Sequence, residues 1–127
     1  MDVFAAIKGR RSVREFKPDP VDEKDLEKIL NAGRLSPSAG NCQPWDFVVV
    51  RDDAVKQKLV RAALGQSFLA EAPVVVVVCA NIHRTAERYG KRGAELYCIQ
   101  DTAAATQNIL LAAHALWTLR RAAPAPT

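Results

Sequence analysis

The sequence predicts a single domain built from both α-helices and β-strands. Its 127 residues are too few for two ordinary domains, and 49% hydrophobic with 25% charged residues is typical of a globular protein. Several segments space their apolar residues at helical intervals behind an acidic capping residue. Two short valine-rich runs lie between these segments and have the composition expected of strands.

The N-terminal third is expected to be helical and to end in a loop. Residues 3–8 form a short amphipathic segment with its apolar side chains on one face. A longer helix is predicted over residues 22–33, because Asp22 can cap its first turn and apolar residues then recur at helical spacing. The turn-rich residues 36–41 end this helix.

The middle of the chain contains the two predicted strands. The first spans residues 45–51, and an aspartate-capped helix follows through Leu64. The second spans Val74–Cys79, where successive valines indicate a strand buried on both faces. Residues 81–93 are polar and basic, and they are predicted to form a loop.

The last and longest helix is predicted from Ala94 to about Leu119. Its second half offers little polar surface, so it should be buried or lie at a subunit interface. Polar residues recur along it two helical turns apart and are predicted to form one narrow stripe, with Gln100, Gln107 and His114 in one row and Asp101 and Asn108 beside it. Such a stripe needs partners, which could be another helix, a loop or a ligand. Taken singly, each member is either a satisfied core residue or a ligand contact.

Composition argues against several function classes. The net charge of +4 is compatible with an anionic ligand but too low to indicate a nucleic-acid-binding protein. No apolar run reaches the roughly 20 residues of a membrane-spanning helix, and no signal peptide is visible. The three cysteines lack C-x-x-C spacing, which disfavours disulfides and metal sites and makes the cytoplasm the expected location. No catalytic triad, carboxylate pair or P-loop pattern is present, so we assign no catalytic residue.

The stretch GRRSVREF, residues 9–16, concentrates positive charge near the N-terminus. Arginine suits phosphate because its planar guanidinium donates two parallel hydrogen bonds. In extended backbone Arg10, Ser12 and Arg14 would point to one side, with Arg11 on the other. The spacing alone leaves three interpretations open: a solvated helix end, a nucleic-acid contact, or a site for a small phosphate-bearing ligand.

A second group of candidates lies in the loop before the first strand. Its small residues let the backbone approach a ligand closely, and Ser38, Asn41 and Gln43 offer hydrogen-bond donors and acceptors. Pro44 disfavours the right-handed helical conformation at Gln43. The same segment could instead be a plain turn in which Trp45 is buried and anchors the strand.

Three motifs together resemble the nitroreductase-like FMN-dependent flavoprotein family. They occur in the family's order and spacing, and they are RRSVREF, SPSAGNCQPWDFVVV and YCIQDTAAATQNILLAAHAL. The resemblance runs from Met1 to about Leu116. It implies an α+β fold with a mixed sheet flanked by helices, and an obligate homodimer that binds FMN in two sites at its interface.

Carried over by position, the resemblance assigns two groups of FMN-binding residues. The contacts to the phosphate, ribityl chain and pyrimidine edge match Arg10, Arg11, Ser12 and Arg14. The loop that reaches the flavin, in part from the partner subunit, matches Pro37, Ser38, Ala39, Asn41 and Gln43. The long helix resembles the central helix of the dimer interface, so its polar stripe would pair across that interface.

The resemblance also implies an activity. The family oxidises NAD(P)H and reduces nitroaromatic, quinone or related acceptors by a ping-pong hydride mechanism with FMN as cofactor, so no acid–base pair is needed. An alternative is a non-catalytic flavin- or nucleotide-binding remnant, inactive because the C-terminal part is missing. A nucleic-acid-binding protein is disfavoured, since no aromatic residues interleave with the arginines.

The sequence departs from the family pattern after Leu116. The family continues with a glycine-containing turn, a third strand and further helices, whereas this chain has an Arg/Ala/Pro tail. Reading the codons of Trp117 and Thr118 one base later can give Gly-Leu, so we expect a truncated or frameshifted member. The predicted domain therefore covers residues 1–119 and is incomplete, and residues 120–127 are expected to be a disordered tail. For the same reason we expect weak retention of FMN.

Overall fold

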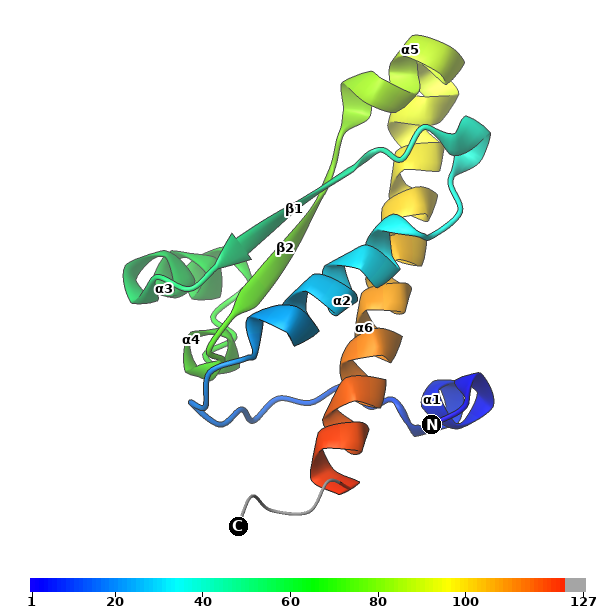
Figure 1. Cartoon of the computed structure of the whole chain (residues 1–127). Coiled ribbons are helices and arrows are strands. Elements are labelled where there is room, and N and C mark those ends of the chain that lie inside the picture. Colours follow the sequence, from blue (N-terminus) through cyan, green and yellow to red (C-terminus); the bar gives the residue numbers. More distant parts are fainter. Residues whose placement is uncertain (123–127) are drawn as a thin grey trace.

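The computed structural model contains helices and a two-stranded sheet, with α2 and α6 to one side of the strands, which confirms the α+β class (Figure 1). The structure describes residues 1–122, with side chains through residue 117. The elements, in chain order, are α1 (Val3–Gly9), α2 (Glu23–Arg34), η1 (Ala39–Asn41), β1 (Trp45–Val50), α3 (Asp53–Ala62), α4 (Phe68–Glu71), β2 (Val75–Ala80), α5 (Ile82–Arg92), η2 (Gly93–Tyr97) and α6 (Cys98–Ala122). Helices α3 and α4 lie where β1 ends and β2 begins, and α5 lies at the opposite end of the strands.

Strands β1 and β2 pair in antiparallel orientation. Trp45 lies opposite Ala80 and Val50 lies opposite Val75, so the two strands match along their whole length. Both strands fall within one residue of their predicted bounds. Where we expected a larger mixed sheet, the described residues contain this antiparallel pair.

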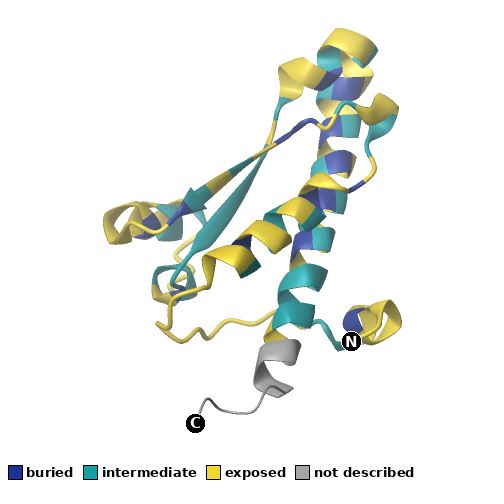
Figure 2. Ribbon diagram, in the orientation of Figure 1, coloured by how far each residue is buried: buried dark blue, intermediate teal, exposed yellow. Residues whose placement is uncertain are grey.

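Strand β2 is less buried than its valines predicted. Every residue from Val75 to Cys79 has intermediate exposure, and the strand is teal throughout this run in Figure 2. Because successive side chains point to opposite faces, intermediate exposure at each position means that neither face is fully covered. The prediction of a strand buried on both faces is therefore wrong for the described part of the chain.

Helix α2 crosses α6 at a close approach centred on Gly33. A Cβ atom at Gly33 would lie 2.9 Å from Ile109 Cγ1 and 3.0 Å from Phe47 Cζ. Beside this contact Asn108 Nδ2 donates a 3.0 Å hydrogen bond to the Ala32 carbonyl. The missing side chain at Gly33 therefore lets α2 fit between the sheet and α6.

Residues 81–93, which we expected to form a loop, contain helix α5. The Asn81 side chain caps the helix by accepting a 3.1 Å hydrogen bond from the Arg84 amide. Thr85 is fully buried, whereas most of the other side chains of α5 are polar or charged and exposed. The loop prediction is wrong because it followed the polar, basic composition of the segment, although its less exposed residues, Thr85, Ala86 and Tyr89, recur at helical spacing. The helix kinks at Gly90, where φ is 57° and ψ is −134°.

Helix α6 follows a π-helical turn, η2, and extends to Ala122. Residues 120–122, which we assigned to a disordered tail, are helical, and the rest of that tail lies outside the described residues. None of the helices in the described part of the chain is long and apolar enough to cross a membrane.

Replacing Gly33 by valine should destabilise the protein by about 1–3 kcal/mol, because the added side chain overpacks the α2–α6 contact. Intrinsic helix propensity favours valine over glycine, so a loss of stability isolates the tertiary contact. The free energy of unfolding is measured by urea denaturation followed by circular dichroism. Lys28→Ala, at an exposed position of α2, serves as the control and should change stability by less than about 0.5 kcal/mol. Equal midpoints for Gly33→Val and the wild type would contradict the proposed contact.

Candidate functional site

The arginine stretch begins at the end of α1 and has no regular secondary structure. Arg10 is the C-cap of α1, and its N–H donates to the Ala6 carbonyl. Arg11 Nη1 donates to the Lys8 carbonyl over 2.8 Å and to the Arg10 carbonyl over 2.9 Å. The Arg11 guanidinium therefore folds back onto the end of α1, where it satisfies helix carbonyls.

The other three predicted phosphate ligands are less engaged. The side chains of Arg10, Ser12 and Arg14 make no hydrogen bond or ion pair with any residue that the structure describes, and Ser12 and Arg14 are exposed. Farther along, the centres of the Phe16 ring and the Phe68 ring on α4 are 6.1 Å apart. This aromatic contact attaches the end of the stretch to α4. Two guanidinium groups and a hydroxyl are thus available to an anion.

The 38–43 loop, Ser38–Gln43, is a tight turn closed by its own side chains. Ser38 Oγ accepts a 2.9 Å hydrogen bond from the Gln43 amide, and Gln43 Nε2 donates to Asn41 Oδ1 over 3.0 Å. Gly40, Asn41 and Gln43 all have positive φ angles, of 59°, 53° and 51°. Gln43 therefore lies outside the right-handed helical region, as its position before a proline predicted. The side chains of Asn41 and Gln43 are exposed at the surface of this turn.

The flanks of the loop differ in burial. Pro37 is exposed and Ala39 is half-buried. Trp45, with 6% of its surface exposed, anchors the following strand as expected of a plain turn. A buried anchor beside an exposed, polar turn is also the arrangement that a rigid binding loop requires.

Helices α5 and α6 contact the backbone of the 38–43 loop. Both carboxylate oxygens of Asp101 lie 3.3 Å from the Ala39 amide, which donates to them. Arg84 Nη1 donates to the Gln43 carbonyl over 2.6 Å, and Arg88 Nη1 donates to the Gly40 carbonyl over 3.2 Å. Neither arginine was among the predicted site residues, because residues 81–93 were expected to form a loop. Their spacing of four residues behind a capping asparagine was the available signal.

The structure separates the two polar rows of α6. Asp101 and Asn108 face inward, to the loop and to α2, whereas Gln100 and Gln107 are exposed. His114 lies where α1 meets α6, because a Cβ atom at Gly9 would come within 2.8 Å of its Nε2 atom. Two members of the predicted stripe are therefore satisfied by their own chain.

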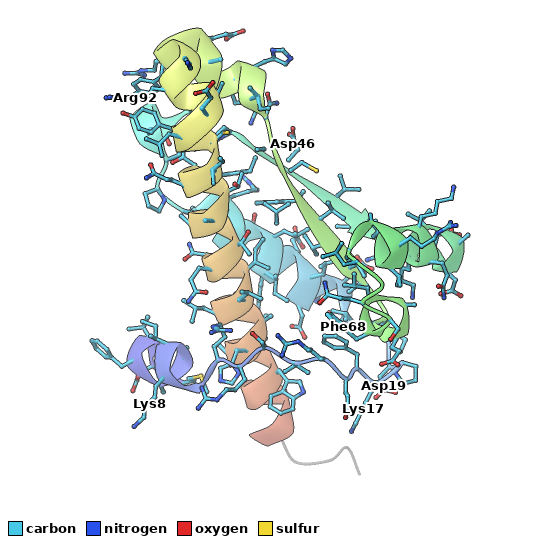
Figure 3. The ribbon with its side chains drawn as sticks, turned by 180° about the vertical axis from the view of Figure 1, so that it is seen from behind. Lys8, Lys17, Asp19, Asp46, Phe68 and Arg92 are labelled. Atoms are coloured by element: carbon cyan, nitrogen blue, oxygen red, sulfur yellow. The ribbon has the colours of Figure 1, made fainter. Side chains whose placement is uncertain are left out.

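One chain does not bring the two predicted groups of FMN ligands together. The arginine stretch leaves α1 beside His114, and the 38–43 loop meets α6 at Asp101. These positions are thirteen residues apart on one helix, or about 20 Å at 1.5 Å per residue. Figure 3 shows the same separation, with Lys8 of α1 and Arg92 of α5 toward opposite ends of α6.

The donor chemistry of both groups fits FMN. Guanidinium groups with no partner among the described residues suit a phosphate, and exposed amide side chains on a turn suit the polar edge of a planar ring. Among the described residues no three His, Cys, Asp or Glu side chains are grouped so as to hold a metal ion. Both groups therefore fit FMN by the chemistry of their donors, and they contact α6 at positions thirteen residues apart.

Sequence comparisons identify relatives of this chain. The model of the Nitroreductase family matches residues 7–66 and 60–116. A putative NADH dehydrogenase/NAD(P)H nitroreductase from Archaeoglobus fulgidus is 42% identical over 110 residues, which cover 87% of this chain and 60% of that protein. An NADH dehydrogenase from Thermus thermophilus is 49% identical over 82 residues, which cover 65% of this chain and 40% of that protein. The chain thus spans 60% or less of the length of these two relatives.

Solved structures with the same fold carry names of the same kind as the sequence relatives. A putative NADH dehydrogenase/NAD(P)H nitroreductase from Parabacteroides distasonis has a TM-score of 0.78 and 28% identity, covering 89% of this chain and 62% of that one. The NADPH:FMN oxidoreductase from Vibrio harveyi, solved with NAD⁺, has a TM-score of 0.79 and 25% identity, covering 89% of this chain and 51% of that one. From the family match across most of its length and this shared fold, we conclude that the chain belongs to the nitroreductase family.

Proposed function

We propose that this chain is a subunit of a homodimeric, FMN-dependent oxidoreductase that takes electrons from NAD(P)H. The observation that carries the proposal is the separation of the two groups of candidate ligands by about 20 Å along α6. A two-fold axis that crosses α6 midway between these groups would place the arginine stretch of one copy beside the 38–43 loop of the other. Each dimer would then contain two equivalent sites.

The exposed face of α6 supports this arrangement. It carries a row of apolar side chains along most of the helix and its preceding turn: Leu96, Ile99, Leu110 and Trp117, with exposed fractions of 45%, 61%, 43% and 56%. Gln107 lies on the same side near the midpoint of the two groups. Helix α1 adds Phe4, which is 79% exposed. An apolar surface of this extent is typical of a subunit interface.

The two groups have different roles in the proposed site. Arg10, Ser12 and Arg14 would bind the phosphate, and Arg11, already engaged at the end of α1, would orient that stretch and reach the cofactor only with its remaining donors. The loop of the partner copy would contact the flavin ring through its backbone and polar side chains, using Pro37, Ser38, Ala39, Asn41 and Gln43. When bound, FMN supplies reversible hydride transfer, and the protein supplies binding and orientation.

The names of the relatives support the choice of donor and acceptor. They include NAD(P)H nitroreductases and an NAD(P)H-dependent FMN reductase from Bacillus subtilis that is 31% identical over 83 residues. We propose that NAD(P)H and a nitroaromatic, quinone or related acceptor occupy the same space in turn. A cytoplasmic location stays a prediction.

Arg14→Ala should weaken FMN binding about tenfold, because it removes one charge-assisted contact to the phosphate. Riboflavin, which has no phosphate, should bind the wild type and the variant equally. Equilibrium titrations followed by flavin fluorescence measure both affinities and also detect weak binding.

Arg61→Ala is the matched control, since Arg61 is an exposed arginine on α3, far along the chain from the stretch. It should leave both affinities unchanged. Equal FMN affinities for the Arg14 and Arg61 variants would show that the arginine stretch does not bind the phosphate.

Oxidation of NADH and NADPH with benzoquinone or nitrobenzoate as acceptor tests the activity itself. We expect oxidation that depends on added FMN and shows the parallel-line kinetics of a ping-pong reaction. Stoichiometric FMN binding without any NAD(P)H oxidation would favour the non-catalytic remnant instead.

Leu110→Glu should convert the dimer to a monomer and weaken FMN binding about tenfold or more, because it places a charge in the proposed interface. Light scattering after gel filtration measures the mass, and a flavin titration measures the affinity. Leu64→Glu introduces the same chemical change at a side chain that is 95% exposed in the turn after α3, and it should change neither property. A dimeric Leu110→Glu variant with normal FMN affinity would contradict the proposed interface.

A further inference from the structure

The backbone of the 38–43 loop is in a conformation that needs external support. Asn41 and Gln43 have φ angles of 53° and 51°, in the left-handed region that non-glycine residues rarely adopt. Such backbone persists where surrounding contacts hold it, and it is common at ligand-binding sites. The hydrogen bonds within the loop close the turn but do not attach it to the helices.

Three side chains from outside attach the loop to the helices, and all three contact its backbone. Arg84 and Arg88 of α5 donate to the Gln43 and Gly40 carbonyls, and Asp101 of α6 accepts from the Ala39 amide. The contacts therefore fall at the beginning, the middle and the end of the loop. Main-chain contacts of this kind fix the loop's shape without using its side chains.

The two arginines are themselves held in place. Arg84 Nη2 lies 3.7 Å from Asp46 Oδ1, and Asn81 Nδ2 donates to the other carboxylate oxygen over 3.2 Å. The Arg88 guanidinium lies 5.6 Å from the centre of the Tyr89 ring, where the aromatic face favours a cation. Tyr89 in turn meets Tyr97 edge to face at 5.0 Å. Neither guanidinium is therefore a freely solvated charge on the helix surface.

Gly40 shows how closely α5 approaches the loop. A Cβ atom at Gly40 would clash with Tyr89 Oη and lie 2.9 Å from Arg88 Nε. The backbone of the loop thus rests directly on α5, and a side chain at this position would separate them. The φ angle of 59° at Gly40 also suits glycine best.

We propose that Arg84 and Arg88, with Asp101 opposite them, are positioning residues that hold the 38–43 loop in the shape required to contact the flavin. This inference rests on the proposed function, which assigns the loop to the FMN site. The arginines act through the backbone of the loop and are not themselves ligands of the cofactor.

Hydrogen exchange of the protein without FMN tests the first part of the proposal. The amides of Ala39, Asn41 and Gln43 are all hydrogen-bonded, so the loop should be protected in the wild type. Arg84→Ala and Arg88→Ala should each raise exchange in the peptide covering the loop about tenfold, with α2 unchanged.

Arg92→Ala is the matched control, because it removes the same charge from the same helix. The Arg92 side chain is exposed and makes no hydrogen bond or ion pair with the part of the chain that the structure describes. In the Arg92→Ala variant, the amides of the 38–43 loop should exchange as fast as in the wild type. Loop exchange in Arg84→Ala and Arg88→Ala equal to that in Arg92→Ala would overturn the proposal.

FMN titration tests the second part. Arg84→Ala should weaken FMN binding about tenfold and shift the visible spectrum of the bound flavin, whereas Arg92→Ala should do neither. Arg84→Lys should recover part of the affinity, since lysine can donate to the Gln43 carbonyl but lacks the planar fork that also reaches Asp46. A more mobile loop with unchanged FMN affinity and spectrum would overturn the positioning role.

The two experiments separate this inference from the function on which it rests. A wild-type chain that binds no FMN contradicts the proposed function, and the positioning role falls with it. The exchange data from the cofactor-free protein would still decide whether the arginines hold the loop.

Discussion

The close approach of α2 to α6 at Gly33 is the constraint on which the rest of the structure depends. With only a hydrogen atom as its side chain, Gly33 lets the two helices come near enough for Asn108 to reach the carbonyl of Ala32. The chain leaves α2 directly after this crossing, so the crossing determines where the 38–43 loop begins. Asp101, two helical turns before Asn108 on α6, accepts a hydrogen bond from the Ala39 amide. One helix thus holds both the end of α2 and the loop that follows it.

The length of α6 determines how the candidate site can be completed. The helix keeps α1 and the 38–43 loop apart, because each contacts it at a different level (Figure 1). A rigid helix holds these two contact positions at a fixed separation, which is why the proposed site draws its two groups of ligands from two copies of the chain. The apolar side chains left exposed along α6 give that second chain a surface to cover. The proposed dimer interface and the proposed cofactor site therefore depend on each other, because the site takes ligands from both copies.

Local signals in the sequence predicted most of the elements. Asp22 accepts a hydrogen bond from the Lys24 amide and begins α2 where the capping pattern placed it. Strand β1 was also predicted from a local signal, the β-branched and aromatic residues that follow Trp45. Helix α5 was predicted to be a loop, because its exposed face is as polar and basic as a loop usually is. The fully buried side chain of this helix is Thr85, which is neither large nor apolar and so did not indicate a buried face.

The sequence by itself determined the family motifs, most of the element types and the residues that could bind a phosphate, because these depend on neighbours within a few positions. Only the tertiary structure decided which of those residues are available. Arg11 is engaged at the end of α1, whereas the Arg14 guanidinium has no partner within the described part of the chain. Only the fold brought Arg84 to Gln43, across about forty residues. Contacts of that range depend on how helices pack, and side-chain spacing along a chain does not encode packing directly.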